Sequence, residues 1–477
     1  MPDCFEIIHK DLAGRLGRLT TPHGTVETPA LMPVVNPHLM MIKPSMLKKL
    51  GAQMLITNSY IISQDPQLRE AAEEKGLHAL LDFDGPIMTD SGAFQLSVYG
   101  SVEVQPLEIL RFQQAIRSDV CVPLDIPTPP DVPPERAAAE LRETEARLEE
   151  ARASWEGDLL LAGPIQGSTY PSLREAAARK VREIGFDVCP VGGVVPLMEA
   201  YRYRDLVQVV AAAKRGLGSG APVHLFGAGH PMVFALAAAL GCDLFDSAAY
   251  AIYARDGRYL TPYGTWKLEE MKYLPCSCEV CSSHSAEELR SSPDRVSLLA
   301  RHNLAASLQE IELVKQRIWE GSLWELLESR CRTHPRMLDG LKSLESMAED
   351  LEKLDRVSKS TLFYLSPQSA RRPEVVRYGR RVERIALYGR VLITDMRPSE
   401  EDRRSFDHIL SFKPPFGPYP HQLAETYPLN AEVPLEPDRE ALEQALANAR
   451  KLIQANPAAS FQLRLRDVED ADSLVRP

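Results

Sequence analysis

Short apolar runs alternate with longer segments of helical composition from residue 30 to about residue 250. A polar or glycine-containing turn follows each run, and this alternation is typical of βαβ units. Eight such runs are present, at residues 30–35, 54–57, 86–89, 120–124, 159–165, 187–191, 222–226 and 242–245. The pattern therefore predicts eight strands that are joined by helices.

Two of the connecting segments are clear helix candidates. Residues 134–155 are rich in Ala, Glu, Arg and Leu, which favour helices, and residues 231–240 are almost wholly apolar. Both begin with proline, which a helix tolerates at its first position. We therefore expect helices over both segments.

Eight strands over about 220 residues fit a closed (β/α)₈ TIM barrel, although an open doubly wound sheet gives a similar local pattern. The positions of the polar residues discriminate between them. Asp90, Asp125, Gln166, Gly193 and Asp246 each follow closely on a different predicted strand. An open sheet would gather its ligand groups at one switch point, beside a glycine-rich turn, and the nearest candidate at 227–232 lacks the third glycine. The barrel is favoured.

The segments on either side of the predicted barrel have a different character. Residues 5–27 alternate apolar and polar side chains around Pro22 and Gly24, which predicts a hairpin capping the barrel floor. Beyond residue 340 we expect a strand at 384–394 and a helix at 439–455, separated by the proline-rich run 413–420. We therefore expect a catalytic domain at 1–340 and a smaller α/β domain at 341–477.

Composition limits the class of protein. The 477 residues and 44% hydrophobic content are enough for two or three packed domains. The longest apolar run, 232–240, is far shorter than the roughly 20 residues of a membrane span. The first residues carry acids where a secretory signal has basic residues. We expect a cytoplasmic protein without a membrane-spanning segment.

The net charge of the chain and its local distribution give opposite indications about an RNA partner. The net charge of −11 argues against an RNA partner, because proteins that bind RNA usually present a basic surface. Charge can be local, however, and residues 371–390 hold seven arginines: Arg371, Arg372, Arg377, Arg380, Arg381, Arg384 and Arg390. This cluster is either an RNA-contacting patch or a solvated helix face or strand surface.

Three of the eight cysteines lie close together, at Cys276, Cys278 and Cys281. In a reducing compartment such a cluster indicates a metal site rather than disulfides. His302 is the favoured fourth ligand because it falls in a helical segment that could brace it, and His284 is the rival. A Cys₃His set fills all four positions of zinc, so one structural zinc per chain is predicted. The alternative is a group of reactive or buried free cysteines.

Several short motifs occur together and in a fixed order. They are Asp-Ser-Gly-Ala-Phe-Gln at 90–95, Pro-Ile-Gln-Gly at 164–167, Gly-Gly at 192–193, Leu-Phe-Asp-Ser at 244–247, and the Cys-X-Cys-X-X-Cys segment. This set resembles the tRNA-guanine transglycosylase family over roughly residues 5–340. Segments 123–129 and 192–196 look like the archaeal branch. The resemblance implies a TIM barrel with an inserted zinc-binding subdomain, at 276–302 here.

The resemblance also implies the catalytic residues. Breaking an N-glycosidic bond develops positive charge at ribose C1′, for which a carboxylate is the natural partner. Asp246 matches the family's nucleophile, which would attack C1′ and hold the RNA covalently. Asp90 matches the general acid/base that exchanges a proton with the departing and incoming bases.

Base recognition follows from the same resemblance. Asp125 and Gln166 match the pair that binds the donor and acceptor edge of guanine. The backbone of Gly193, Val194 and Val195 would contact O6 and the substituent at position 7. Phe94, in the first motif, would stack on the base. Six residues are therefore expected to contact the base: Asp125, Gln166, Gly193, Val194, Val195 and Phe94.

By resemblance to the archaeal branch, the incoming base is 7-cyano-7-deazaguanine (preQ0) and the target is guanine 15 in the tRNA D-arm, a step of archaeosine biosynthesis. Reaching that guanine requires the arm to unfold and the nucleotide to unstack. The resemblance further implies a homodimer. The PUA domain usual in this branch is not recognisable, which suggests a separately encoded PUA-domain subunit.

Three alternatives remain open at this stage. The chain could be a non-exchanging paralogue that modifies a base already inserted, although such proteins need not keep both Asp90 and Asp246. A TIM barrel with two carboxylates is also typical of a glycosidase. A tRNA-binding scaffold without catalytic activity is the third.

Overall fold

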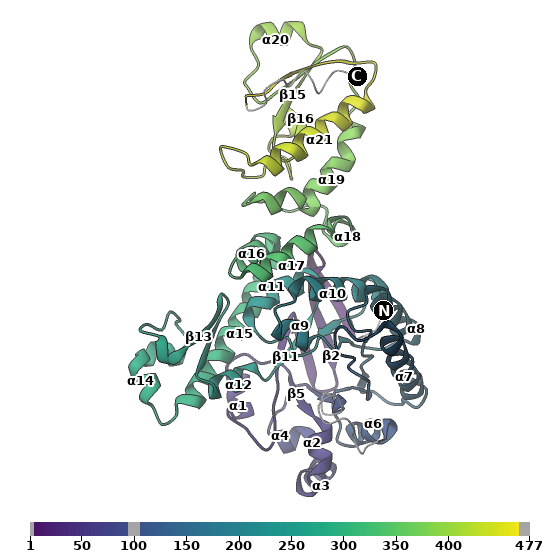
Figure 1. The fold of residues 1–477 in the computed structure, drawn as a ribbon, viewed down its shortest axis with the longest axis vertical. Helices are drawn as coiled ribbons and strands as arrows, with labels where there is room; N and C mark the ends of the chain where they lie inside the picture. The colour runs from purple at the N-terminus through teal and green to yellow at the C-terminus, as the bar shows by residue number, and fades with distance from the viewer. Residues whose placement is uncertain (1–3, 94–104, 467–477) are drawn as a thin grey trace. The chain divides into compact units, whose positions relative to one another are not determined.

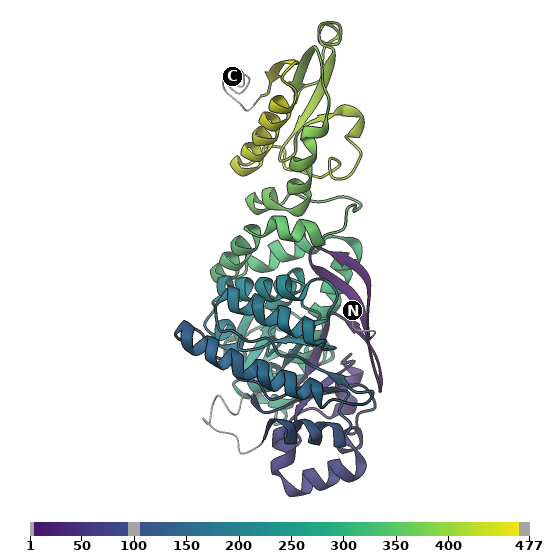
Figure 2. The same cartoon turned by 90° about the vertical axis from the view of Figure 1, so that its right-hand side faces the viewer.

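The computed structural model describes residues 4–93 and 105–466, and the chain divides into two compact units. Unit 1 comprises Met1–Trp319 and Ser329–Ser343, and unit 2 comprises Glu320–Glu328 and Leu344–Pro477. Each unit has its own sheet and hydrophobic core. Figures 1 and 2 show the elements from two directions.

Unit 1 begins with a three-stranded antiparallel sheet, which contains the hairpin expected around Pro22 and Gly24 and one further strand. The strands are β1 Phe5–Asp11, β2 Gly14–Thr21 and β3 Gly24–Thr28. The expected turn joins β2 to β3, and a further turn occurs where Leu12 adopts a φ of 57°. Leucine rarely takes this left-handed conformation, so the sequence pattern does not signal the second turn.

A parallel strand overlaps each of the eight predicted runs. The strands are β4 Ala30–Pro33, β5 Leu55–Asn58, β6 Ile87–Asp90, β7 Val120–Cys121, β8 Leu160–Leu161, β9 Cys189–Val191, β10 Val223–Leu225 and β11 Leu244–Ser247. They form two four-stranded parallel sheets, with orders β4-β11-β10-β9 and β5-β6-β7-β8. The predicted mixed α/β architecture with parallel strands is confirmed.

Isolated parallel bridges connect residues of the two sheets. Val34, directly after β4, pairs with Ile56 of β5. On the other side Ala162 pairs with Val188, and Ile165 pairs with Val191 of β9. Each sheet is therefore bridged to the other at both of its edges.

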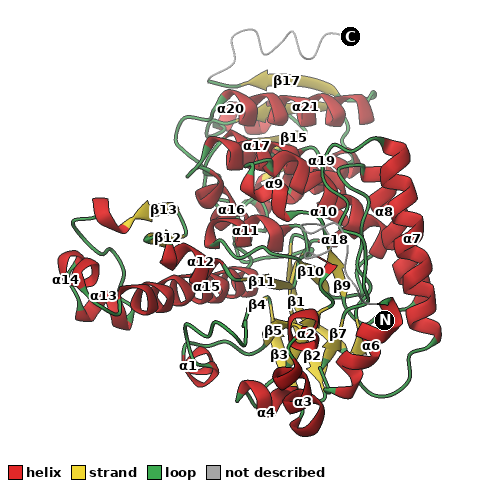
Figure 3. Cartoon of the chain, turned by 60° about the horizontal axis from the view of Figure 1, so that its bottom comes forward, coloured by secondary structure: helices red, strands yellow, loops and turns green. Residues whose placement is uncertain are grey.

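Apolar side chains of these strands form the core of unit 1. Met32, Ile56, Met88, Val188 and Leu244 are all buried in one cluster. Helices lie around the strands in Figure 3. Every residue of β4, β9, β10 and β11 is buried, so the side chains on both faces of these strands are covered. This covering explains why the strands appear in the sequence as continuous apolar runs rather than as alternating ones.

The helices between the strands fit the expectation from composition. Their bounds are α1 Pro44–Lys49, α2 Ser59–Gln64, α3 Pro66–Lys75, α4 Leu77–Leu81, α6 Pro106–Ala115, α7 Pro134–Ala153, α8 Pro171–Ile184, α9 Val195–Glu199, α10 Tyr203–Leu217, α11 Pro231–Ala239 and α12 Ala249–Arg255. Helices α7 and α11 confirm the two helices predicted at 134–155 and 231–240.

A further group of elements follows the eighth strand. It contains β12 Arg258–Thr261, β13 Gly264–Lys267, α13 Glu279–Ser283, α14 Ala286–Ser291, α15 Arg295–Glu320, α16 Leu323–Cys331 and α17 Pro335–Glu345. The three clustered cysteines lie just before and within α13, and His302 lies in α15.

Unit 2 is an α/β unit with a four-stranded sheet of order β16-β15-β14-β17. Its elements are α18 Ala348–Leu354, α19 Pro373–Arg381, β14 Arg390–Thr394, α20 Glu400–Ser405, β15 His408–Lys413, β16 Gly417–Pro420, α21 Arg439–Ala455 and β17 Ser460–Arg464. The helix predicted at 439–455 is confirmed. The strand predicted at 384–394 begins only at Arg390, because Val382–Arg384 forms a 3₁₀ turn.

The seven arginines at 371–390 do not form one surface patch. Arg372 is fully buried and Arg377 is buried, each in ion pairs within unit 2, whereas Arg371, Arg380, Arg381, Arg384 and Arg390 are exposed. Arg372 and Arg377 therefore belong neither to an RNA-contacting patch nor to a solvated face. Among the described residues, no helix is long and apolar enough to cross a membrane.

Candidate active site

The polar residues that follow the strands converge on one pocket of about 1390 Å³. Asp90 ends β6, and Asp246 lies in β11. Asp125, Gln166 and Gly193 come from the loops after β7, β8 and β9. Five groups from five strands thus meet at one place, because the carboxyl ends of neighbouring parallel strands lie at the same edge.

The remaining expected substrate-binding residues are Val194, Val195 and Phe94. Val195 also lines the pocket, whereas the Val194 side chain is fully buried. Phe94 lies outside the described residues.

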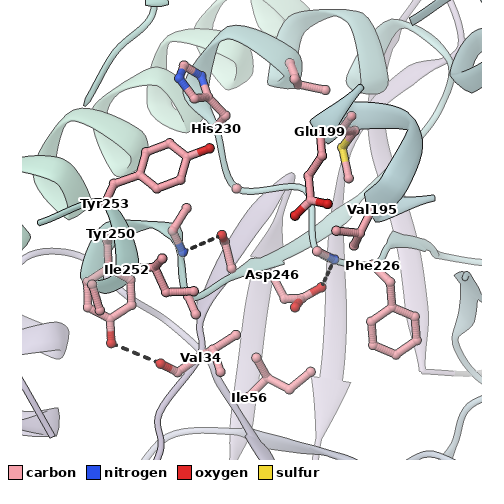
Figure 4. Close-up of a pocket in the computed structure, with 18 of the residues that line it drawn as sticks. Val34, Ile56, Val195, Glu199, Phe226, His230, Asp246, Tyr250, Ile252 and Tyr253 are labelled. Carbon is pink, nitrogen blue, oxygen red and sulfur yellow. Dashed lines mark hydrogen bonds between the residues drawn. The ribbon is translucent and has the colours of Figure 1, made fainter. Parts of the chain in front are cut away.

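The Asp246 carboxylate is held by two donors on the same oxygen. Nε2 of His224 lies 2.8 Å from Oδ1, and the main-chain N–H of Gly227 donates to Oδ1 over 2.7 Å. Figure 4 shows Asp246 on the pocket wall between Val195 and Ile252, with the bond to the Gly227 N–H dashed. The carboxylate is therefore fixed in one orientation at the pocket wall.

Asp90 is the second carboxyl group of the pocket. Nδ2 of Asn58 donates to its Oδ2 over 3.0 Å, and the Ser59 hydroxyl donates to its main-chain oxygen. Burial raises the pKa of Asp90 to about 7, and the negative charges of Asp125 and Asp246 act in the same direction. A carboxyl group that titrates near neutrality can both give and take protons.

Asp125 and Gln166 form a hydrogen-bonded pair in the lining of the same pocket. Nε2 of Gln166 donates to Oδ2 of Asp125 over 2.6 Å, and both side chains are buried. Burial raises the pKa of Asp125, while the bond from Gln166 lowers it. The Gln166 oxygen Oε1 is buried and accepts no hydrogen bond from the described residues. The pair thus offers a carboxylate beside an amide group.

Glycines leave room beside this pair. Gly193 has a φ of +67°, and a Cβ there would lie 3.0 Å from Oε1 of Gln166. At Gly192 a Cβ would lie only 2.2 Å from Nε2 of Gln166. Both positions therefore exclude a side chain, which lets the main chain come close to the Asp125–Gln166 pair.

Arg174 of α8 supports the two loops that carry these groups. Its guanidinium is fully buried and donates to main-chain oxygens on both loops. The acceptors are Ser168 and Ile165 after β8, at 2.8 and 2.7 Å, and Gly192 after β9, at 2.8 Å. One side chain thus ties the Gln166 loop to the glycine loop.

A cysteine and histidine cluster lies outside the pocket lining. One ligand atom each from Cys276, Cys278, Cys281 and His302 lies within 4.8 Å of the others. His302 Nδ1 is 3.5 Å from the Cys278 sulfur and 3.3 Å from the Cys281 sulfur. His284 instead contacts the main-chain oxygen of Val280, so His302 and not His284 completes the cluster.

The chain is similar throughout its length to known proteins. The family model described as queuine tRNA-ribosyltransferase matches residues 11–336. The tRNA-guanine(15) transglycosylase of Methanosarcina barkeri is 58% identical over 461 residues, which cover 97% of this chain and 94% of that protein. Proteins with the same name from Haloferax volcanii and Archaeoglobus fulgidus are 54% and 48% identical, cover 97% of this chain, and are themselves 90% and 96% covered.

The chain belongs to the queuine tRNA-ribosyltransferase family. The resemblance to archaeal-type tRNA-guanine transglycosylases is thereby confirmed. The match of the family model ends at residue 336, within α17, whereas the relatives also match the elements of unit 2.

Three residues of this family member's site were not predicted. His224 had a possible signal, since it is a polar residue inside the apolar run 222–226. Asn58 accepts from the N–H of Ile61 and so caps α2, which is a recognisable role for Asn between a strand and a helix. Arg174 gave no signal, because its helix also carries the exposed Arg179.

Proposed function

We propose that this chain exchanges guanine 15 in the D-arm of tRNA for preQ0, a step of archaeosine biosynthesis. The arrangement that carries the proposal is a pocket with Asp90 and Asp246 on its wall and the Asp125–Gln166 pair beside them. Relatives named tRNA-guanine(15) transglycosylase, at 48–58% identity, support the substrate assignment. Family membership favours this function over the glycosidase and scaffold alternatives.

In the proposed reaction Asp246 attacks ribose C1′, and the bond from C1′ to guanine N9 breaks. The electron pair leaves with guanine, which takes a proton from Asp90. The incoming base then gives its N9 proton to Asp90 and attacks C1′, which returns the electron pair to the Asp246 carboxylate. Asp90 suits both proton transfers, since its pKa of about 7 allows either state near neutrality.

The base is proposed to bind against the Asp125–Gln166 pair. The Asp125 carboxylate accepts from N1 and the 2-amino group, while an N–H of the Gln166 amide or of the backbone at Gly193 to Val195 faces O6. Phe94 is proposed to stack on the base. Asp125→Asn should therefore weaken base binding more than it slows the covalent step, which a rise in the base KM with little change in kcat would reveal.

The Cys₃His cluster fits a structural zinc ion. Zinc–sulfur bonds of about 2.3 Å in a tetrahedron place ligand atoms roughly 3.5–4 Å apart, and the four ligand atoms here lie within 4.8 Å. Nε2 of His302 lies 3.0 Å from the main-chain oxygen of Leu260, which leaves Nδ1 as the ligand atom that faces the sulfurs. Zinc would tie α13 to α15, and it takes no part in the exchange.

The zinc assignment can be tested by Cys278→Ser. The variant should lose its zinc, measured by elemental analysis, and melt at a lower temperature than the unaltered chain. Retention of both metal and melting temperature would show that the cluster is not a zinc site. Cys189→Ser is a suitable control, since Cys189 is buried in β9 away from the cluster.

We also propose that the eight strands form a closed (β/α)₈ barrel, supported by the bridges at Val34–Ile56 and Ile165–Val191. Residues 1–340 would form the catalytic domain and residues 341–477 a domain that contacts tRNA or a partner. The family resemblance adds a homodimer within the cytoplasm. Sedimentation of the purified chain with and without tRNA would test the dimer and the tRNA complex.

The experiment that tests the function is incubation of the chain with tRNA and preQ0, followed by mass spectrometry of the nucleosides. Modified base at position 15 is the expected result. Asp246→Asn should abolish incorporation without a change in melting temperature, because a neutral amide cannot attack C1′. Lack of incorporation together with lack of labelled guanine exchange would favour the non-exchanging paralogue.

A further inference from the structure

We propose that His224 is a positioning residue that acts with the Gly227 N–H to make Oδ2 of Asp246 the oxygen that attacks ribose C1′. The inference rests on the proposed function, in which Asp246 forms a bond to the RNA. His224 lies in β10, which pairs with β11, the strand that carries Asp246. The two side chains thus come from adjacent strands of one sheet.

The first observation is that the two carboxylate oxygens of Asp246 differ in their hydrogen bonds. Both His224 Nε2 and the Gly227 N–H bind Oδ1, at 2.8 and 2.7 Å. Within the described part of the chain, no hydrogen bond reaches Oδ2. The Asp246 side chain is 10% exposed and lines the pocket. The oxygen without donors is therefore the one left available to a substrate.

The second observation is the isolation of the imidazole. The His224 side chain is completely buried, and its ring packs against Phe226 with centroids 4.4 Å apart. Nδ1 is buried and has no hydrogen-bond partner in residues 4–93 and 105–466. Since a carboxylate oxygen only accepts, the proton that is shared with Asp246 belongs to Nε2.

Burying an imidazole that makes a single polar contact costs free energy of folding. Burying an unpaired polar atom is unfavourable, and an aliphatic residue would pack in β10 without that cost. The only side-chain hydrogen bond of His224 among the described residues is the one to Asp246. The side chain of His224 is therefore better explained by its contact with the Asp246 carboxylate than by a contribution to stability.

The arrangement suits both halves of the exchange. As the Oδ2–C1′ bond forms, the C1′–N9 bond breaks and its electron pair leaves with guanine, which receives the Asp90 proton. Oδ1 then becomes the carbonyl oxygen of the ester and still accepts from both donors. When the incoming base attacks C1′, the electron pair of the Oδ2–C1′ bond returns to the carboxylate, and the same donors stabilise its charge. Neither donor has to move.

Three variants test the role of His224. His224→Leu removes the donor, and His224→Gln keeps an N–H at a similar distance from the main chain. Val223→Ala is the matched control, because it alters a buried neighbour in the same strand whose side chain points to the opposite face. Labelled guanine exchange gives kcat and KM for tRNA, and a denaturing gel gives the fraction of chain bound covalently to tRNA.

We expect His224→Leu to lower kcat about 10- to 100-fold, the effect of losing one hydrogen bond to a charged group, and to lower the covalent fraction. KM for tRNA should stay unchanged, since the buried ring cannot touch RNA. His224→Gln should recover most of kcat, and Val223→Ala should keep it.

Several results would overturn the inference. They are an unchanged kcat in His224→Leu, an equal loss in the Leu and Gln variants at unchanged melting temperature, or a change confined to KM. If His224→Leu does not fold, His224→Asn replaces it, because its amide is too short to reach Asp246, and the same comparison with Gln applies. Absence of exchange by the unaltered chain would instead refute the proposed function.

Discussion

Two carboxyl groups that line one pocket have different surroundings. Asp246 receives two donors on one oxygen, Oδ1. Asp90 has burial and the charges of Asp125 and Asp246 against its ionisation, so its pKa rises to about 7. In the proposed reaction Asp246 attacks, while Asp90, with a pKa near neutrality, moves protons.

The raised pKa of Asp90 predicts the pH dependence of the first half-reaction. In the proposed reaction only protonated Asp90 supplies the departing guanine with a proton, so kcat/KM for tRNA should fall as pH rises through about 7. The fall should approach tenfold per pH unit. Initial rates of labelled guanine exchange, measured from about pH 5.5 to about pH 9, give the profile. Asp90→Asn should lower the rate and remove this limb, and a limb that persisted in the variant would assign it to another group.

The raised pKa of Asp90 also predicts how the stability of the chain depends on pH. The pKa of Asp90 is higher in the folded chain than in the unfolded one, so its contribution to stability is complete below about pH 4 and is lost as pH rises to about 7. Asp90→Asn cannot ionise. The variant should therefore melt above the unaltered chain at pH 8, with the difference disappearing toward pH 4, as differential scanning fluorimetry would show. The prediction would be contradicted if the melting temperature of the variant minus that of the unaltered chain were lower at pH 8 than at pH 4.

At the scale of elements, the position of the proposed base-binding residues depends on how the loops after β8 and β9 are joined. Arg174 spans them with three main-chain hydrogen bonds from a fully buried guanidinium. Lysine has one donor centre and cannot reproduce this planar set of donors. The link between the two loops therefore belongs to arginine alone.

Arg174→Lys should lower the free energy of unfolding by about 2–4 kcal/mol, since buried carbonyl oxygens lose their donors. It should also raise KM for the base, because Gln166 and Gly193 lie on the loops that separate. Arg179→Lys is the matched control on the same helix, where the side chain is half exposed and pairs only with Glu175 within the described residues. Chemical denaturation and exchange kinetics measure both effects, and equal behaviour of the two variants would refute the linking role.

The sequence predicted these elements unevenly, for physical reasons. Strands buried on both faces appear as apolar runs, so all eight were located, and prolines at the helix starts located α7 and α11. The turn at Leu12 was missed because it needs a conformation that leucine seldom adopts. The burial of Arg174 and Arg372 was not predicted, because an arginine buried by tertiary contacts has the same local sequence as a solvated one. Periodicity predicts which face is buried and not which polar group is buried with it.

At the scale of the whole chain, the two units differ in what stabilises them. Unit 1 has the apolar cluster of its parallel strands and the Cys₃His cluster. Unit 2 has a smaller apolar cluster and a group of buried charges, in which Arg372 contacts Glu325 at 2.7 Å and Glu374 at 3.2 Å, and Lys359 contacts Glu374 at 2.7 Å. Burial opposes the ionisation of Glu374, but Arg372 and Lys359 outweigh it and hold its pKa well below the usual value.

This difference predicts that the two units unfold in separate transitions, each sensitive to its own substitution. Arg372→Met leaves Glu325 and Glu374 buried without one cation, which should cost about 3–5 kcal/mol and lower one melting transition. Cys278→Ser should lower the other by removing a metal ligand. Arg381→Met, an exposed change on the same helix as Glu374, should shift neither.

Differential scanning calorimetry of the full chain tests whether the two units unfold in separate transitions. Because each core lies within one unit, a substitution in one should leave the transition of the other in place. A single transition that moves with either substitution would mean that the chain unfolds as one cooperative body. In that event the charges around Arg372 would stabilise the proposed active site as well as unit 2, and Arg372→Met would lower the temperature at which guanine exchange is lost.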